Sequence, residues 1–234
     1  MGNTDYDRKI QETDSSIFHL SGYADVTSVA FGNKAYMLER LFEEGMNVPF
    51  SLYLRGSYLE NIFIESRKGE YEKLRSGLNE YTLRDGIKEW INGQERNEQL
   101  LDILSTFVKG RNDIRFAVRS SSNLEDSDER SYAGVFDTVL NVTTAEEMVD
   151  AVRKVFVSRY TYSVDDPDKV TMGIIIQEQV EADYSGVAFS VNPVTGDDEI
   201  VLSYAKGACE QVVSGEIGSE IIVEKTANSM IPGV

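Results

Sequence analysis

The chain of 234 residues is 41% hydrophobic and 27% charged, the composition of a soluble globular protein that is long enough for one large core or two small ones. Forty acidic residues against 23 basic residues give a formal net charge of −17, which disfavours nonspecific binding to nucleic acids or anionic membranes. A polyanionic ligand therefore requires a local basic site or a bridging cation.

Cysteine and histidine are each present once. The lone Cys209 excludes an intramolecular disulfide, and together with the lone His19 it argues against a Cys/His zinc site. No secretory segment opens the chain, and no apolar run approaches membrane-spanning length. We therefore expect a cytoplasmic protein without nucleic-acid or membrane partners.

The N-terminal part combines a polar beginning with one clear helix. Residues 1–16 are expected to form a flexible lead-in, and residues 17–29 are expected to be irregular. After Gly32, a helical pattern that ends at Gly45 has its apolar positions at Ala35, Leu38, Leu41 and Phe42. Lys34 lies in the first turn, where free N–H groups and the helix dipole favour an anion. Two interpretations stay open here: Lys34 is a phosphate ligand, or it is a solvated lysine beside a Gly-Asn turn.

The next segment contains one strand and a helical region. Residues 47–54 (NVPFSLYL) are expected to form a short strand. From 56 to 109 the sequence is helical and charged, with three apolar groups: Leu74 and Leu78; Ile87, Trp90 and Ile91; and Leu100, Leu101, Leu104, Phe107 and Val108. A tryptophan at helical spacing among isoleucines is typical of a core rather than of a stacking site. No catalytic constellation is evident in this region.

Residues 114–142 form the central stretch of the chain. A buried-strand pattern (Ile114, Phe116 and Val118) leads to Arg119, three serines, an acidic loop expected to be mobile, and a second β-rich run. This order can hold a polyphosphate, because backbone N–H groups and hydroxyls can approach the anion and arginine supplies a forked donor. Taken alone, the Arg-Ser-Ser pattern is equally consistent with a polar hairpin loop.

The residues after this stretch predict a capped helix and a buried strand. Thr144 and Glu147 have the spacing of a capping box, and the helix that they begin is expected to run to about Tyr160. Residues 172–180 are expected to form a buried strand whose polar residues come at its end. Such an end often lines a ligand crevice, although these polar residues can equally belong to a strand edge.

Short strands dominate the C-terminal part. They are predicted at 186–191, 199–204 and 220–224, with a tight turn over 192–196 between the first two. The last ten residues are expected to be frayed. Helices and antiparallel-type strands follow one another without a sustained βαβ rhythm, so the predicted fold class is α+β.

The segment that begins at Val118, VRSSSNLEDSDERSYAGVFDTVLNV, resembles the nucleotide-binding motif of the phosphoenolpyruvate synthase and pyruvate phosphate dikinase family, a branch of the ATP-grasp proteins. Members of that family carry a Val-Arg-Ser-Ser start, a Glu-Asp pair and an aromatic-Ala-Gly loop with this spacing, followed by Asp-Thr and a Leu-Asn strand. Further blocks match in the same order, at 32–35, 48–49, 177–180, 185–190, 192–196 and 207–215. The blocks together span most of 31–225 and are far more specific than any one motif.

The resemblance implies an ATP-grasp-like nucleotide-binding domain of α+β class, expected to be incomplete at its C-terminal end. Four parts are expected along the chain. They are the flexible lead-in (1–16), a mostly helical N-terminal subdomain (17–112), a β-rich ATP-grasp part (113–225) and the frayed end of a truncated domain (226–234).

Carried over residue by residue, the resemblance implies a set of ATP contacts. Lys34 and Arg119 would be the catalytic residues, holding the ATP phosphates and neutralising charge that develops during transfer. The loop around Gly134, with Thr138 close behind, would cover the triphosphate, and Gln177 would hydrogen-bond the adenine amino group. The remaining implied contacts are the backbone at Gln179 and Val180 for the ring edge, Asp183 for the ribose and Glu210 at the phosphate end. Mg²⁺ would accompany ATP, and its ligands stay unassigned.

The sequence also departs from the family pattern. Asn33 and Cys209 each replace a glycine, so two close-approach loops are expected to be less permissive here. Val135-Phe136 replaces a more polar pair. The Pro-Asp pair usually found after the Val-x-Gly block is absent, and Gly218-Ser219 stand near its place.

The family's full reaction passes phosphate from ATP to a histidine on a swivelling domain, and then to pyruvate or another acceptor at a third domain. His19 lies before the nucleotide motifs, and we interpret it as a structural or surface histidine rather than a phosphocarrier. The segment that ligates Mg²⁺ in relatives is expected after Lys225 and is absent. The chain is therefore expected to be a fragment or a subunit that works with phosphohistidine and acceptor-binding domains elsewhere, and to be inactive alone in the full reaction.

Two function classes remain open. The first is the ATP-binding part of a dikinase-like, ATP-dependent phosphotransferase, and the second is a nonenzymatic regulatory or interaction module on a degenerate ATP-grasp scaffold. Lys34, Arg119 and Gln177 favour the first class, because a remnant has no physical need for these three residues. Asn33 and Cys209 favour the second. The sequence specifies neither the final phosphate acceptor nor the oligomeric state.

Overall fold

The computed structural model of the chain describes residues 17–22, 26–111, 113–123, 137–160, 170–207 and 219–224. The chain forms two compact units, Met1–Gln179 and Val180–Val234. Several expected features lie outside the described residues: the lead-in, the acidic loop that follows Asn123, the loop that contains Cys209 and Glu210, and the frayed end.

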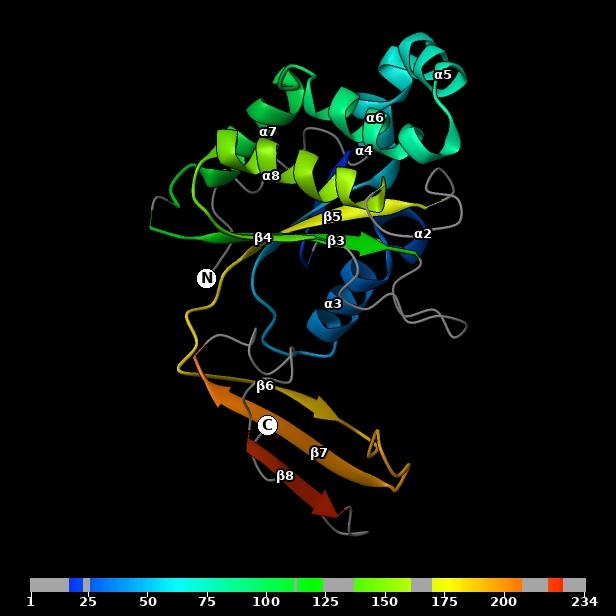
Figure 1. Cartoon of the computed structure of the whole chain (residues 1–234). Helices are drawn as coiled ribbons and strands as arrows, with labels where there is room; N and C mark the ends of the chain where they lie inside the picture. The colour runs from blue at the N-terminus through cyan, green and yellow to red at the C-terminus, as the bar shows by residue number, and fades with distance from the viewer. Residues whose placement is uncertain are drawn as a thin grey trace. The chain divides into compact units, whose positions relative to one another are not determined.

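The first unit is built on a five-stranded antiparallel sheet with the strand order β1-β2-β5-β3-β4 (Figure 1). In that order the strands are β1 (Phe18–Leu20), β2 (Ser51–Leu54), β5 (Met172–Glu178), β3 (Phe116–Ser122) and β4 (Thr138–Val142). Three consecutive β-branched residues, 174–176, favour the extended backbone of the central strand β5. All three are buried, because helices cover both faces of the sheet.

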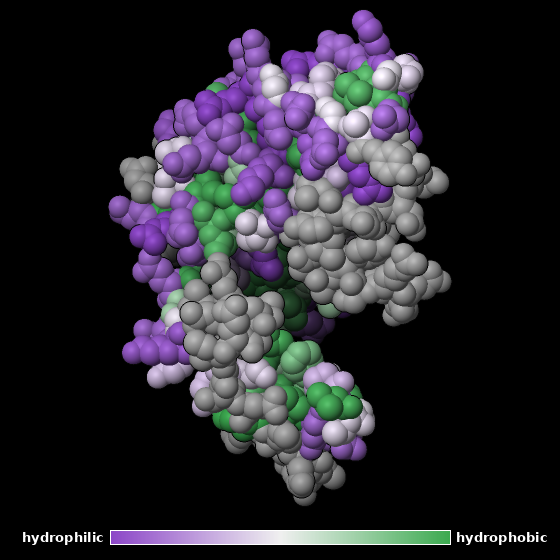
Figure 2. Space-filling view, in the orientation of Figure 1, coloured by the Kyte–Doolittle hydropathy of each residue, from purple (hydrophilic) through white to green (hydrophobic). Residues whose placement is uncertain are grey.

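Helices α4 to α8 cover one face of this sheet (Figure 1). They are α4 (Gly56–Phe63), α5 (Lys68–Gly77), α6 (Glu80–Asn92), α7 (Glu98–Val108) and α8 (Ala145–Val157), with short 3₁₀ turns η1 (Glu65–Arg67) and η2 (Ser158–Tyr160) after α4 and α8. Their apolar sides form the main core with sheet residues such as Phe116, Val118 and Ile176. Their outer surface is mostly hydrophilic (Figure 2). In the described part of the chain, every helix is too short or too polar to cross a membrane.

The predicted capping box at the start of α8 is confirmed. The Thr144 hydroxyl accepts a hydrogen bond from the Glu147 N–H at 3.2 Å, and the Glu147 carboxylate accepts one from the Thr144 N–H at 3.2 Å. These reciprocal bonds satisfy two N–H groups that have no partner within the helix. The pattern in the sequence therefore located the first residue of this helix.

The opposite face of the sheet carries α2 (Ser28–Phe31) and α3 (Asn33–Glu43). A second apolar core lies there, made of Val26, Phe31, Ala35, Tyr53 and Ile175. The junction of the two helices approaches the sheet closely: a Cβ on Gly32 would lie 2.0 Å from the Ser121 carbonyl oxygen, and a Cβ on Gly173 would lie 2.3 Å from that of Phe31. Glycine is therefore needed at both positions for α2 and α3 to lie against β3 and β5.

The second unit is a three-stranded antiparallel sheet with the order β6-β7-β8. Its strands are β6 (Tyr184–Phe189), β7 (Glu199–Lys206) and β8 (Ser219–Glu224). The predicted turn between the first two strands is confirmed. The Asn192 side-chain oxygen accepts from the N–H groups of Val194 at 2.9 Å and Thr195 at 3.2 Å, and Gly196 has a φ of 78°.

The α+β class is confirmed, but two local expectations were wrong. Residues 17–29 are not irregular, because they contain β1 and α2; a strand of three residues is too short to show a period, and β1 depends on its pairing with β2. The helical region contains α4 in addition to the three helices expected, with the buried residues Tyr58, Leu59, Ile62 and Phe63. The chain divides into its two compact units after Gln179, and β1 and β2 share a sheet with β3, β4 and β5.

Candidate functional site

One row of paired residues crosses all five strands of the first unit and contains two of the predicted site residues. His19 lies opposite Tyr53, Tyr53 opposite Ile175, Ile175 opposite Arg119, and Arg119 opposite Thr138. Directly paired residues of antiparallel strands project to the same face. Because Tyr53 and Ile175 pack in the core beneath α2 and α3, the row faces α3. The structure therefore brings Arg119 and Thr138 together on the α3 side of the sheet.

Arg119 is bonded to Gln177, a third predicted residue. The Arg119 Nη1 donates to Gln177 Oε1 at 3.1 Å, and the Gln177 Nε2 donates to Ser51 Oγ at 3.1 Å. Gln177 is only 7% exposed and Ser51 is fully buried, so this line of polar groups runs into the interior. We refer to Ser51, Gln177 and Arg119 as the polar triad.

Lys34 lies in the first turn of α3, beside the strand that carries Arg119. Gly32 is the N-cap residue, and the first turn contains no acidic side chain. The Ala35 N–H donates to Ser121 Oγ at 3.0 Å. Ser121 is two residues from Arg119 on β3, so both side chains lie on the α3 face. The positive end of the helix and Lys34 are thus held next to the arginine strand.

Asn33 and Cys209 each stand where the family has a glycine, and the structure describes only the first of these two positions. Asn33 is the first residue of α3, and the backbone there does not require glycine, because among the described non-glycine residues only Asn141 has a positive φ. The left-handed conformation falls instead on Gly32, whose φ is 82°. Asn33 is therefore compatible with the close approach of this loop, whereas Cys209 lies outside the described residues.

Gln179 follows β5 and is held by Asn141 of β4. The register between β3 and β4 shifts there, so that two residues of β4 lie opposite one residue of β3, which is a β-bulge. Asn141 belongs to this bulge and has a φ of 59°. Its N–H donates to Gln179 Oε1 at 2.9 Å, and its Oδ1 accepts from Gln179 Nε2 at 3.3 Å. The Gln179 backbone N–H donates to the Arg115 carbonyl at 2.8 Å.

Val180 and Asp183 belong to the second unit. The Asp183 carbonyl accepts from the Gly207 N–H at 2.8 Å, and Gly207 has a φ of 88°. Gly207 is three residues before Glu210 in the sequence. Glu210 itself and Gly134 of the first unit lie outside the described residues.

A buried carboxyl group and a buried phenol also lie on the α3 side of the sheet. Glu39 of α3 is 4% exposed and accepts from the Gly22 N–H at 2.9 Å. Burial raises the pKa of the Glu39 carboxyl. Burial, with a smaller contribution from the Glu39 charge, also raises the pKa of the Tyr53 phenol. Both environments favour the uncharged form of the group.

His19 is packed into the protein rather than presented to solvent. It is 7% exposed, its Nε2 lies 3.1 Å from the Arg55 Nη2, and its ring meets the Phe31 ring edge to face at 5.2 Å between centroids. A histidine that carries phosphate between sites must present a ring nitrogen to donor and acceptor. The packing supports the structural interpretation of His19.

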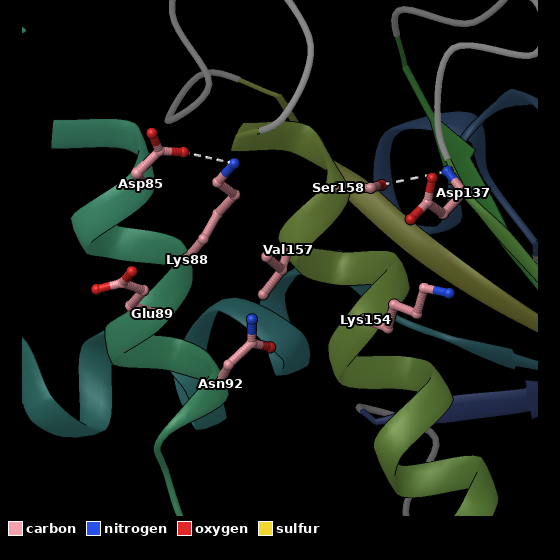
Figure 3. Close-up of a pocket in the computed structure, with 8 residues that line it drawn as sticks. All are labelled: Asp85, Lys88, Glu89, Asn92, Asp137, Lys154, Val157 and Ser158. Carbon is pink, nitrogen blue, oxygen red and sulfur yellow. Dashed lines mark hydrogen bonds and ion pairs between the residues drawn. The ribbon is translucent and has the colours of Figure 1, made fainter. Parts of the chain in front are cut away.

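A polar cavity of about 450 Å³ lies between α6 and α8 (Figure 3). It is lined by Asp85, Lys88, Glu89, Asn92, Asp137, Lys154, Val157 and Ser158. Its Lys88 Nζ already pairs with Asp85 at 2.6 Å, and the Asp137 N–H donates to Ser158 Oγ at 3.3 Å. None of the residues that the sequence assigned to nucleotide binding lines this cavity.

Sequence reasoning missed Ser51 and Asn141. A signal for Ser51 was present, because a hydroxyl inside an apolar strand needs a partner. The partner was not predictable, since Gln177 is 126 positions away. Asn141 interrupts a run of strand-forming residues, and asparagine is one of the few residues that adopt the left-handed conformation readily.

The chain matches a known family over most of its length. Residues 30–232 match the family described as "Pyruvate phosphate dikinase, AMP/ATP-binding domain". This range contains every residue that the sequence assigned to nucleotide binding.

Relatives of the chain are longer proteins. It is 32% identical over 216 residues to the "Uncharacterized phosphotransferase YvkC" of Bacillus subtilis, covering 87% of this chain and 24% of that protein. It is 32% identical over 221 residues to the "Probable phosphoenolpyruvate synthase" of Methanocaldococcus jannaschii, covering 83% of this chain and 18% of that protein. It is 32% identical over 171 residues to the "Phosphoenolpyruvate synthase" of Aeropyrum pernix, covering 68% of this chain and 20% of that protein. The chain thus spans between 18% and 24% of the length of these three relatives.

Proposed function

Because the chain belongs to the pyruvate phosphate dikinase family and matches its AMP/ATP-binding domain, we propose that it binds ATP as the ATP-grasp-like part of a dikinase-like phosphotransferase. The observation that carries this proposal is the arrangement on the α3 face. There Arg119 of β3 lies opposite Thr138 of the neighbouring strand β4. Arg119 also lies next to the helix turn that contains Lys34. Two cationic side chains and a helix N-terminus suit a triphosphate.

Lys34 and Arg119 are the proposed catalytic residues. They hold the phosphates and neutralise the charge that develops during phosphate transfer. Thr138, on the strand beside Arg119, contributes a hydroxyl, and the loop around Gly134 covers the triphosphate. The close contact of Gly32 with Ser121 supports the phosphate assignment, because it keeps the positive end of α3 against β3.

The nucleoside contacts are proposed at residues of the last part of β5 and of the sequence that follows it. Gln177 hydrogen-bonds the adenine amino group, and the backbone at Gln179 and Val180 contacts the ring edge. Asp183 binds the ribose, and Glu210 lies toward the phosphates. The hydrogen bond between Asp183 and Gly207, which is three residues before Glu210 in the sequence, supports the assignment of Asp183 and Glu210 to one ligand.

Magnesium is proposed to arrive with the triphosphate. Among the residues that the structure describes, no group of three or more histidine, cysteine, aspartate or glutamate side chains is arranged to hold a metal ion. The bound cation would neutralise phosphate charge. The residues of this chain that hold phosphate are the cationic Lys34 and Arg119, which fit the triphosphate rather than the metal.

Phosphate is proposed to pass next to a carrier histidine and then to pyruvate or another acceptor. These steps need phosphohistidine and acceptor-binding domains, in the same longer protein or in a partner subunit, because the packing of His19 does not suit a carrier. We expect this chain alone to show no steady pyruvate-dependent ATP consumption in an assay for AMP and phosphoenolpyruvate. Sustained turnover by the purified chain would contradict this part of the proposal.

Thermal unfolding with and without Mg-ATP tests nucleotide binding. A ligand at a hundredfold excess over its dissociation constant adds about 2.7 kcal/mol to the free energy of unfolding. A protein of this size then unfolds about 5–10 °C higher. We expect Arg119→Ala to lose this rise, and Arg96→Ala to keep it, because Arg96 pairs with Asp150 on the helical side. Absence of any rise in the folded wild-type protein would contradict ATP binding.

A further inference from the structure

We infer that Ser51 is a positioning residue for phosphate binding: it fixes the Gln177 amide, and the amide fixes the guanidinium of Arg119. This inference rests on the proposed function, since it explains how the proposed phosphate ligand is oriented. It assigns a role in nucleotide affinity to a fully buried serine on β2, two strands away from Arg119 in the sheet.

The direction of each hydrogen bond in the polar triad is determined. The Ser51 hydroxyl donates to the Pro49 carbonyl at 2.9 Å, so its oxygen is left to accept from Gln177 Nε2 at 3.1 Å. The Gln177 oxygen must then point to Arg119, whose Nη1 is 3.1 Å away. Arginine has donors only, so a flipped amide would place an NH₂ group against the guanidinium. Only one orientation of the amide satisfies both neighbours.

Ser51, the buried end of the polar triad, is held by backbone hydrogen bonds. The Ser51 N–H donates to Ser21 Oγ at 3.1 Å, and the Ser51 carbonyl accepts from the Ser21 N–H at 2.9 Å. Ser51 and Gln177 are directly paired across β2 and β5, and Gln177 is paired with the small Ala117 on its other side. The amide is therefore confined between two strands at 7% exposure. Hydrogen bonds in such a low-dielectric site hold their geometry strongly.

Removal of the Ser51 hydroxyl would act on Arg119 without touching the nucleotide. Gln177 Nε2 would lose an acceptor, the amide could rotate, and its bond to the Arg119 guanidinium would lose a fixed orientation. Phosphate binding by arginine depends on the orientation of the planar fork. The base would be affected less, because the proposed site also contacts it through the backbone at Gln179 and Val180, which Ser51 does not touch.

Dissociation constants for Mg-ATP and for adenosine test this inference in wild type, Ser51→Ala and Ser21→Ala. We expect Ser51→Ala to weaken ATP binding about three- to tenfold, the effect of one buried hydrogen bond, and to change adenosine binding by less than about twofold. Ser21→Ala is the matched control, because it removes a buried hydroxyl that bonds the Ser51 backbone and not its side chain. It should not lower the ATP affinity relative to adenosine.

The inference is overturned if Ser51→Ala binds ATP as wild type does, or if it loses ATP and adenosine equally, or if Ser21→Ala shows the same selective loss. A folded wild type that fails to bind ATP would instead overturn the proposed function, and this inference with it. If Ser51→Ala does not fold, Gln177→Leu is assayed with inorganic tripolyphosphate, which has no base. Loss of tripolyphosphate affinity supports the role of the triad, and wild-type affinity contradicts it.

Discussion

Arg119 is held in place by the protein itself. Its guanidinium donates to a nearly buried glutamine, whose other end is bonded to a buried serine. A side chain that is already oriented loses less conformational freedom when it binds a ligand. Lysine would keep the charge at this position but not the planar fork, so we do not regard the two residues as interchangeable here.

Glu39 tests whether a buried negative charge on the α3 side of the sheet lowers the free energy of unfolding. Burial raises the pKa of its carboxyl, so between its unfolded and folded pKa values the native state binds more protons than the unfolded state. The free energy of unfolding therefore falls as the pH rises through this window, and the cost is fully present above the folded pKa. Glu39→Gln removes the charge and still offers an oxygen to the Gly22 N–H. We expect this variant to unfold at a higher temperature than wild type at neutral pH.

The comparison is made by thermal unfolding from about pH 8 to about pH 5. The difference in unfolding temperature between Glu39→Gln and wild type should become smaller as the pH falls, because wild-type Glu39 then becomes protonated. Glu44→Gln at the C-cap of the same helix is the control, since the Glu44 side chain is 70% exposed. A gap that stays constant with pH, or a less stable Glu39→Gln, would show that Glu39 is not disfavoured by burial.

The bulge residue Asn141 gives a second prediction at this scale. Its φ of 59° disfavours most side chains, whereas glycine adopts this conformation freely. Both Asn141→Ala and Asn141→Gly lose the bond from Gln179 Nε2 to Asn141 Oδ1 and keep the backbone N–H that donates to Gln179 Oε1, but only alanine adds backbone strain. We expect Asn141→Ala to be about 1 kcal/mol less stable than Asn141→Gly in urea unfolding. In an ordinary strand the order is reversed, so a more stable alanine variant would contradict the bulge.

At the scale of elements, Gly32 couples α3 to the sheet. Gly32 and Gly45 flank α3 with φ values of 82° and 79°, so alanine adds backbone strain at both. A Cβ at 32 would also collide with Ser121, whereas a Cβ at 45 would meet nothing within 4 Å. We expect Gly32→Ala to cost about 1–3 kcal/mol more than Gly45→Ala, measured by urea unfolding.

Gly32→Ala should also weaken nucleotide binding more than Gly45→Ala does. If the first turn of α3 holds phosphate, Gly32→Ala moves Lys34 away from β3 and lowers the rise in unfolding temperature caused by Mg-ATP, while Gly45→Ala keeps it. Equal stability of the two variants would refute the close approach of α3. A normal ATP response in Gly32→Ala would separate Lys34 from the phosphate site.

The sequence predicted elements whose signal is local. The capping box at Thr144, the turn at Asn192 and the helices with clear apolar faces depend on residues within a few positions of each other. β1 and α2 were missed because each is too short for its own pattern and forms by packing on the sheet. The strand order β1-β2-β5-β3-β4 joins distant parts of the sequence, and no local pattern contains it.

The candidate site shows the same division. Arg119 and Lys34 were identified because a family resemblance supplied their context. The contact between Arg119 and Gln177 joins residues 58 positions apart, and that between Ala35 and Ser121 joins residues 86 apart. The strand register decides which residues share a face, and the register became visible only in the fold. Ser51 could not be recognised as part of the site without it.

At the scale of the whole molecule, the end of the first unit is firmly held where the chain passes to the second. The Glu178 N–H donates to the Phe50 carbonyl at 2.9 Å, and the Gln179 N–H donates to the Arg115 carbonyl at 2.8 Å. The buried Arg111 lies 3.6 Å from the Glu178 carboxylate. The last residues of β5 are therefore fixed to the first unit up to the point of division.

The net charge of −17 does not conflict with a polyanionic ligand. Charges on the surface are screened over about 8 Å at physiological ionic strength, so a ligand responds mainly to the groups around it. Near Arg119 these groups are Lys34 and the positive end of α3, whose first turn has no acidic residue. The overall charge opposes nonspecific binding of polyanions and leaves a local cationic site effective.

The most direct test of the central claim is a structure of the protein with Mg²⁺ and a nonhydrolysable ATP analogue. We predict phosphate oxygens within about 2.7–2.9 Å of both the Arg119 guanidinium and the Lys34 ammonium. The claim would be contradicted by phosphates bound elsewhere, for example beside Lys88 and Lys154 in the cavity between α6 and α8, with Arg119 bonded only to Gln177.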